Sequence, residues 1–174
     1  MPHVIEPAPT GRAKCRGCGS AIQKDELRFG ERIPNPFADE GEATLWFHLV
    51  CGAYKRPEPL LEALDAAEDD VPDPERLAAL ARVGLEHHRL PRLDAAERSP
   101  TGRASCRSCR TKIAKGAWRF RLVFFEDGRF EPSGFVHAGC AASYFGTADV
   151  LDRARRFTAD LSDEDATELA SALG

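Results

Sequence analysis

The sequence lacks the features of a membrane-spanning or secreted protein. No stretch approaches the roughly 20 consecutive apolar residues that a transmembrane helix needs. The first ten residues, MPHVIEPAPT, contain neither a basic start nor an apolar run. We therefore expect no membrane span and no secretory signal. The 174 residues, of which 43% are hydrophobic and 30% charged, are typical of a foldable chain with one domain or two small ones.

The sequence also lacks the motifs of common hydrolytic and nucleotide-binding sites. A His-Glu-x-x-His motif is absent, because Glu86, His87 and His88 follow one another in the wrong order. The paired motifs of the zinc deaminases and a phosphate loop ending in Gly-Lys-Ser or Gly-Lys-Thr are absent too. With no catalytic constellation in the sequence, we expect that the protein is not an enzyme.

Cysteine is scarce, but all six cysteines follow one duplicated pattern. Each copy has a Cys-x2-Cys pair, then 29 or 27 residues, and then a His-x2-Cys pair. Disulfides are disfavoured in a chain without an export signal, whereas three thiolates and one imidazole form the closed tetrahedral set of structural zinc. The sequence therefore predicts two Zn²⁺ ions per chain, with two redox-active cysteine pairs as the alternative. The predicted ligands are Cys15, Cys18, His48 and Cys51 in the first copy and Cys106, Cys109, His137 and Cys140 in the second.

The repeat extends beyond the predicted metal ligands. The sequence Gly-Arg-Ala-x-Cys ends at the first cysteine of both copies, and Arg28 and Arg119 each follow that cysteine by 13 residues. Both arginines lie between apolar residues in an alternating pattern, which predicts a half-buried strand. On such a strand the arginine side chains point to the face opposite the core. A second short strand is expected to lead into each ligand histidine.

Helical patterns follow each copy. Asp73 before Pro74 predicts one helix start, and Ser162 with Asp165 three residues later predicts another. These helices would provide apolar surface that such small units cannot build alone. The sequence thus predicts a small zinc-stabilised α+β fold with two tandem fingers, each a short antiparallel sheet with following helices. The expected segments are an N-terminal tail (1–10), the first finger (11–56), an acidic helical linker (57–99), the second finger (100–146) and C-terminal helices (147–174).

Charge is segregated along the chain, although the net charge is only −4. The two finger segments carry +2 and +5, whereas the segments 57–99 and 147–174 carry −6 and −4. Guanidinium groups and the backbone N–H groups of a zinc knuckle suit phosphate oxygens. The repeated basic cluster beside the first cysteine pair therefore predicts a nucleic-acid surface, with an ordinary solvated surface as the alternative. The cluster comprises Arg12, Lys14 and Arg16 in the first finger and Arg103, Arg107 and Arg110 in the second.

Both copies resemble the PARP-type zinc finger, which is found in nuclear poly(ADP-ribose) polymerases and in a nick-sensing DNA ligase. The resemblance covers about 46 residues per copy. It rests on Gly-Arg-Ala-x-Cys-x-x-Cys, Ile-x-Lys, Leu/Trp-Arg-Phe and His-x-x-Cys, in this order. Trp46 and Phe47 resemble the aromatic pair that precedes the ligand histidine in the family. The second copy departs from the family at this point, because it has Phe135 and Val136 there.

The resemblance implies recognition of DNA nicks, gaps and ends by structure rather than by sequence. One surface of each finger would hold the phosphate backbone, and the loop before the ligand histidine would stack apolar side chains on exposed bases. For the phenylalanines, packing in the core is the alternative. Ile33 and Pro36 accompany Phe37 in the first loop, and Phe124 accompanies the second pair. The expected DNA-binding residues are Arg12, Lys14, Arg16, Arg28 and Phe37 in the first finger and Arg103, Arg107, Arg119, Phe125 and Phe130 in the second.

The expected partner is DNA with single-strand breaks or ends. The 174 residues hold only fingers and helices, so we expect any chemistry to come from a repair enzyme recruited in trans. Such a protein would be cytoplasmic and associated with the nucleoid in a bacterium, or nuclear in a eukaryote. The alternative function is a zinc-stabilised protein-interaction or regulatory module with the acidic helices as its active surface. A thiol-based sensor and an RNA reader are further alternatives.

Overall fold

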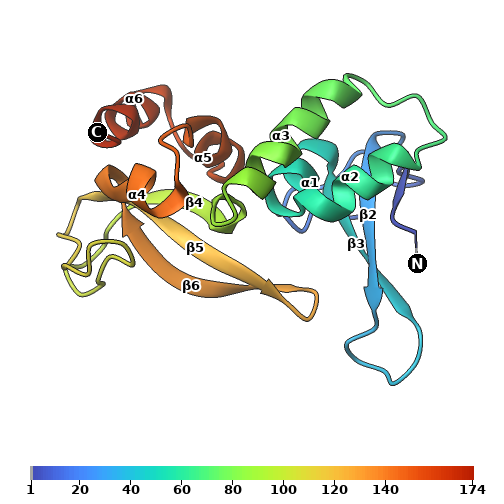
Figure 1. Ribbon diagram of the computed structural model, residues 1–174, viewed down its shortest axis with the longest axis horizontal. Helices are drawn as coiled ribbons and strands as arrows, with labels where there is room; N and C mark the ends of the chain where they lie inside the picture. Colours follow the sequence, from blue (N-terminus) through green and yellow to red (C-terminus); the bar gives the residue numbers. More distant parts are fainter. Residues whose placement is uncertain (1) are drawn as a thin grey trace. The chain divides into compact units, whose positions relative to one another are not determined.

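The computed structural model describes residues 2–174, and the chain divides between Glu86 and His87 into two compact units (Figure 1). Each unit contains a three-stranded antiparallel sheet and its own helices, which confirms the predicted α+β fold. Within the described part of the chain, no helix combines the length and the apolar character needed to cross a membrane.

The first unit places three helices after its sheet. The sheet order is β1-β2-β3, with β1 at Val4–Pro7, β2 at Leu27–Pro34 and β3 at Glu42–His48. The helices are α1 (Leu49–Lys55), α2 (Pro57–Asp65) and α3 (Pro74–Glu86), and α1 and α2 pack against the strands (Figure 1). The start of α3 at Pro74 confirms the helix start predicted from the sequence.

The core of the first unit forms on one face of the sheet. Phe29 and Phe47 are paired across β2 and β3, are fully buried, and stack with their ring centroids 5.7 Å apart. Gly52 lets α1 approach this stack closely, because a Cβ atom at that position would lie 2.6 Å from a ring carbon of Phe29. The alternation of the strand thus directs Phe29 into the core and Arg28 to the other face.

The second unit repeats this order of strands and helices. Its sheet contains β4 (Leu93–Arg98), β5 (Trp118–Glu126) and β6 (Arg129–His137) in the order β4-β5-β6. Short 3-10 turns precede β4 and follow β6, at Leu90–Arg92 and Ala138–Cys140. The helices are α4 (Ala141–Phe145), α5 (Leu151–Phe157) and α6 (Asp163–Ala172). Ser162 caps α6 by accepting a hydrogen bond from the Asp165 N–H at 3.0 Å, as predicted.

The unit boundary differs from the predicted segments at two places. Residues 1–10, expected as a tail, contain β1, which pairs with β2 in the first sheet. The segment 57–99, expected as a linker, is divided between the units: α2 and α3 belong to the first, and β4 is a strand of the second. Neither β1 (VIEP) nor β4 (LDAAER) shows the alternation typical of a strand. Pairing with the neighbouring strand, and not local preference, holds them in place.

The two hairpins end differently. In the first unit, residues 35–41 form an open loop between β2 and β3, at the end of the long hairpin in Figure 1. In the second unit, Asp127 and Gly128 alone connect β5 and β6, with φ angles of +48° and +77°. Two positive φ values are typical of a type I′ turn, the tight turn favoured in hairpins. The two fingers therefore present different tips.

Candidate metal centres and nucleic-acid interface

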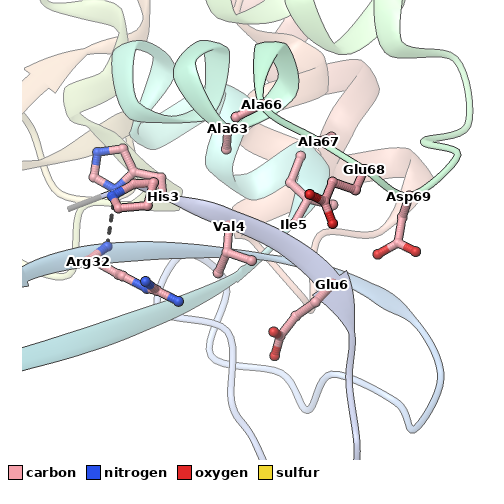
Figure 2. Close-up of a pocket in the computed structure, with 11 residues that line it drawn as sticks. His3, Val4, Ile5, Glu6, Arg32, Ala63, Ala66, Ala67, Glu68 and Asp69 are labelled. Atoms are coloured by element: carbon pink, nitrogen blue, oxygen red, sulfur yellow. Dashed lines mark hydrogen bonds between the residues drawn. The ribbon is translucent and has the colours of Figure 1, made fainter.

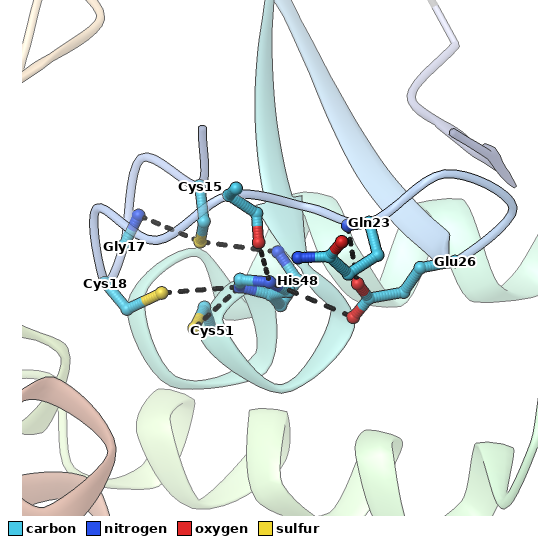
Figure 3. A network of polar contacts seen from close by, with 8 residues as sticks. Cys15, Gly17, Cys18, Gln23, Glu26, His48 and Cys51 are labelled. Carbon is cyan, nitrogen blue, oxygen red and sulfur yellow. Dashed lines mark hydrogen bonds and ion pairs between the residues drawn. The ribbon is translucent and has the colours of Figure 1, made fainter. Parts of the chain in front are cut away.

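The first metal centre is built from a turn, the end of a strand and the first helix. Cys15 and Cys18 lie in the turn, His48 ends β3 and Cys51 lies in α1 (Figure 3). The Nδ1 atom of His48 is 3.3 Å from the Cys18 sulfur and 3.9 Å from the Cys51 sulfur. A tetrahedral zinc, with bonds of about 2.3 Å to sulfur and about 2.0 Å to nitrogen, separates these atoms by about 3.5 Å. The arrangement therefore fits one zinc ion.

The contacts around His48 determine which ring nitrogen faces the thiols. The Nε2 atom lies 3.3 Å from the backbone oxygen of Ala21, so its proton is donated there and Nδ1 is left as the metal ligand. Backbone N–H groups of Gly17 and His48 point at the Cys15 sulfur, at 3.3 and 3.4 Å. Donors at these positions stabilise a thiolate and not a thiol.

The second metal centre repeats the same geometry. The Nδ1 atom of His137 is 3.4 Å from the Cys109 sulfur and 3.9 Å from the Cys140 sulfur. Its Nε2 atom lies 3.2 Å from the backbone oxygen of Lys112. Among residues 2–174, these are the two groups whose ligand atoms all lie within 4.8 Å of one another. The predicted pair of Cys3His zinc sites is confirmed.

The acidities of the thiols show what a metal ion supplies. A hydrogen bond with Thr111 lowers the pKa of Cys109 to about 6. Burial and the negative charge of Cys106 raise the pKa of the neighbouring Cys140 to about 12. The pKa values of two thiols, Cys106 and Cys109, are thus lowered, and the negative charge of these two opposes ionisation of the third. A Zn²⁺ ion supplies the opposing charge that lets all three thiols deprotonate, and its binding free energy becomes folding free energy.

The basic cluster beside each cysteine turn is exposed. Arg12, Lys14 and Arg16 in the first finger and Arg103, Arg107 and Arg110 in the second all have exposed side chains. Each turn is tied to the last strand of its sheet, because the Arg16 N–H donates to the Trp46 oxygen and the Arg107 N–H to the Phe135 oxygen, both at 2.8 Å. The exposed cations are therefore held on a fixed framework next to the metal.

Arg28 and Arg119 are buried, unlike the cations of the basic cluster. They lie on the strand face opposite Phe29 and Phe120, as alternation predicts, but they are only 7% and 5% exposed. The Arg28 guanidinium donates to Glu6 at 2.7 Å and lies 3.4 Å from the centroid of the Trp46 ring. The arginines therefore lie on the predicted side of the strand, but a carboxylate and an aromatic ring cover them.

The second finger covers its strand arginine in the same way. Arg119 donates to Glu97 at 2.9 Å, and its guanidinium lies 3.6 Å from the centroid of the Phe135 ring. Sequence reasoning missed both acidic partners, although a signal was present. Glu6 and Glu97 each precede the first cysteine of their copy by nine residues. The repeat thus begins before the basic cluster, at β1 and β4.

The predicted stacking residues fall into two classes. Phe37 lies in the open loop of the first finger and is 78% exposed, which contradicts packing in the core. Phe125 and Phe130 are half-buried and face each other across the tight turn, with ring centroids 5.1 Å apart. Phe124, which points to the opposite face of β5 from Phe125, is 40% exposed. The first finger therefore has a strongly exposed ring in its loop, and the second has two half-buried rings in contact beside its turn.

A separate hollow of about 430 Å³ lies in the first unit, between β1, Arg32 and the end of α2 (Figure 2). The side chains around it are of both signs, with His3 and Arg32 on one side and Glu68 and Asp69 on the other. The Nδ1 atom of His3 accepts a hydrogen bond from the Arg32 N–H at 3.1 Å, which occupies one polar edge. This mixture of charges does not favour binding of an anion.

Comparison with known proteins finds a zinc-finger family over the first unit. A family model described as the poly(ADP-ribose) polymerase and DNA-ligase Zn-finger region matches residues 6–82. The chain is 29% identical to a poly [ADP-ribose] polymerase of Drosophila melanogaster over 140 residues, which cover 72% of this chain and 14% of that protein. It is 31% identical to poly [ADP-ribose] polymerase 1 of Gallus gallus over 134 residues, 68% of this chain and 13% of that protein.

These matches define what is shared. A match over 72% of the chain is longer than either unit, so the likeness to the Drosophila protein includes parts of both units. The chain nevertheless spans only 14% of that relative's length. The zinc-finger region is therefore common to both proteins, and the remaining length of the relatives has no counterpart in these 174 residues.

Proposed function

Because residues 6–82 belong to the PARP-type zinc-finger family, we propose that this protein binds DNA strand breaks and recognises nicks, gaps and ends by their structure. It acts without catalytic activity of its own, in the compartment where the cell keeps its DNA. The enzymatic step that follows recognition is carried out by a partner bound at the same break. The two zinc sites hold the binding surfaces and take no part in a reaction, because four protein ligands close each site.

One observation carries the proposal: an exposed basic cluster and an exposed aromatic ring occur on the same small finger. Arg12, Lys14 and Arg16 supply charge for the phosphate backbone, which any DNA offers. Phe37 supplies a ring that can stack on a base, which an intact duplex hides and a break exposes. Charge alone would bind every duplex alike, so the discrimination depends on the ring.

The second finger also combines exposed cations with aromatic rings, although other residues supply them. Arg103, Arg107 and Arg110 supply the charge, and the Phe125–Phe130 pair forms the apolar tip beside the β5–β6 turn. Arg28 and Arg119 contribute less to the phosphate contact than the exposed cations, because Glu6 and Glu97 already neutralise them. Their main role in the proposal is to position the aromatic residue that precedes each ligand histidine.

A titration series tests the proposal. Nicked, gapped, blunt-ended and intact hairpin-closed duplexes of one sequence are compared at one salt concentration, with the zinc content of the protein verified. We expect the broken duplexes to bind more tightly than the closed one, and all affinities to fall steeply with salt. A zinc-loaded protein without measurable affinity for any of these DNAs would contradict the proposal and favour the protein-interaction module.

A further inference from the structure

A hollow in the second unit is lined almost entirely by arginine. Its volume is about 200 Å³, and Arg89, Arg92, Arg107 and Arg110 surround it together with Ser133 and Tyr144. No carboxylate occurs among these described lining residues. Four guanidinium groups around one small hollow repel one another unless an anion lies between them. Two of the four, Arg89 and Arg92, were not among the cations singled out in the sequence.

Tyr144 holds the first two arginines in place. Its side chain in α4 is only 8% exposed. The Arg92 guanidinium donates to the Tyr144 hydroxyl at 3.4 Å, and the Arg89 guanidinium lies 5.0 Å from the centroid of the ring. A hydroxyl that accepts from Arg92 still has its own proton to donate. The turn before β4 and helix α4 therefore form one wall of the hollow. This wall presents hydrogen-bond donors to the hollow and no negatively charged acceptor.

The position of the third arginine side chain, that of Arg107, depends on a glycine in β6. The Arg107 Nε atom donates to the Ser133 backbone oxygen at 2.9 Å, which aligns the guanidinium along β6. Gly134 leaves room for the Arg107 side chain. Its φ is +99°, and a Cβ atom there would lie 2.9 Å from Arg107 Nε. The matching position of the first finger is Leu45, three residues before the ligand histidine. Only the second finger therefore has a glycine at the position that makes room for the arginine side chain.

The fourth arginine occupies a strained backbone position. Arg110 has a φ of +67°, in the left-handed region that disfavours residues with a Cβ atom. The matching position of the first finger, four residues after the first cysteine, is Gly19, with a φ of +78°. The same turn is therefore made without strain by glycine in one copy and with strain by arginine in the other. Backbone strain of this kind clusters at ligand-binding sites, which directs attention to the Arg110 side chain that lines this hollow.

We propose that this hollow binds the terminal phosphate of a DNA strand at a break, a proposal that rests on the proposed function. A terminal phosphomonoester carries close to two negative charges and presents three oxygens to guanidinium groups, whereas a backbone diester carries one charge. A nucleobase finds little to stack on here, because the one ring in the lining is already faced by Arg89. The second finger thus reads whether the broken strand ends in phosphate or in hydroxyl.

The test compares nicked duplexes that differ only at the nick. One carries a 5′-phosphate, one a 3′-phosphate and one hydroxyls on both sides, and all are titrated with the full chain at constant ionic strength. We expect one of the phosphorylated nicks to bind about tenfold more tightly than the hydroxyl nick, the ratio typical of a lost charge-assisted hydrogen bond. Inorganic phosphate and a mononucleotide are added in separate competition arms.

Two variants assign the preference to the hollow. The double variant Arg89→Gln/Arg92→Gln should lose the preference for the phosphorylated nick and retain binding to the hydroxyl nick. The matched control Arg155→Gln removes an exposed arginine of α5 outside the hollow, and it should keep the preference. Zinc content and melting temperature are measured for both. If the double variant is destabilised, Arg89→Lys/Arg92→Lys keeps the charge and should retain part of the preference.

The outcomes separate this inference from the proposed function. Equal affinity of the wild-type protein for phosphorylated and hydroxyl nicks overturns the inference, whether or not nicks bind better than intact duplex. A preference that survives in the double variant also overturns it. If inorganic phosphate displaces the phosphorylated DNA more effectively than the mononucleotide does, with no effect on the hydroxyl nick, the ligand is free phosphate and not a DNA end. Absence of binding to every DNA contradicts the proposed function instead.

Discussion

Arg28 and Arg119 are held by the same contacts in the two fingers. Each is buried, donates to a glutamate of the preceding strand, and lies against the aromatic residue two positions before the ligand histidine. The guanidinium therefore connects three segments of its finger close to the metal centre. A residue in such a position contributes to stability through its ion pair and its cation–π contact.

Substitution of Arg28 should consequently affect folding more than that of an exposed arginine. We expect Arg28→Ala to lower the free energy of unfolding of the first unit by about 1–3 kcal/mol, with zinc content unchanged. The matched control is Arg12→Ala, which should leave the melting temperature unchanged and weaken binding to all DNAs. Thermal melts with metal analysis distinguish the two, and equal melting temperatures for Arg28→Ala and wild type would contradict the structural role.

Glu6 provides the complementary test of the same pair. Glu6→Gln keeps the size of the side chain and removes the charge that neutralises Arg28. We expect it to increase DNA affinity and steepen the salt dependence, because the guanidinium charge is then available to phosphate. If Glu6→Gln instead leaves DNA affinity unchanged, Arg28 contributes nothing to DNA binding.

The two hairpins are the elements in which the fingers differ most. The loop 35–41 separates β2 from β3 and leaves Phe37 exposed, whereas the two-residue turn of the second finger brings Phe125 and Phe130 together. A ring that is 78% exposed buries little apolar surface, so it adds little to the stability of its unit and is accessible to solvent. A ring in a pair stabilises the hairpin by about 0.5–1.5 kcal/mol in addition to its burial.

Phe37→Ala should therefore separate stacking from stability. We expect an unchanged melting temperature, nearly unchanged binding to intact duplex, and a loss of about 1–3 kcal/mol in the preference for nicked DNA. Phe125→Ala serves as the comparison, because it should lower the melting temperature of the second unit. A drop of several degrees for Phe37→Ala, with all DNAs weakened alike, would identify the loop as structural.

The sequence predicted those elements that local chemistry determines. Alternation around Arg28 and Arg119 indicated the strands β2 and β5, and the Ser162 cap indicated the start of α6. Alternation also indicated the side of the sheet on which each arginine lies. It could not indicate what covers that side, because β1 and β4 reach it only through tertiary pairing.

The candidate sites also divide into one type that local sequence predicts and one that depends on tertiary structure. Short spacing in the sequence indicated all eight metal ligands, because the two members of each pair are only three residues apart. The arginine-lined hollow was beyond sequence reasoning, since the turn before β4, the cysteine turn, β6 and α4 meet only in the folded unit.

At the scale of the whole molecule, the two units are independent in their sheets, cores and metal ligands. A structural zinc site supplies about 10–16 kcal/mol of apparent binding free energy in small domains, which is comparable with the whole stability of such a unit. Each unit should therefore depend on its own metal ion and not on that of its neighbour.

Loss of one ligand tests this independence. Cys15→Ala should lower the zinc content from two ions to one, unfold the first unit and leave the second folded, because the sites share no ligand. Metal analysis and amide hydrogen exchange resolved by residue measure both effects. Cys106→Ala is the reciprocal control and should unfold the second unit alone. Loss of both ions in either variant would show that the units fold as one.

The most direct test of break recognition compares a covalently closed, relaxed DNA circle with the same circle carrying one nick. Neither DNA has a duplex end, and the two share sequence and length, so only the interrupted strand and its two termini differ. The proposed stacking of Phe37 on an exposed base predicts tighter binding to the nicked circle, by about 1–3 kcal/mol. Equal affinity for the two circles would contradict recognition of breaks and leave only general attraction to the DNA backbone.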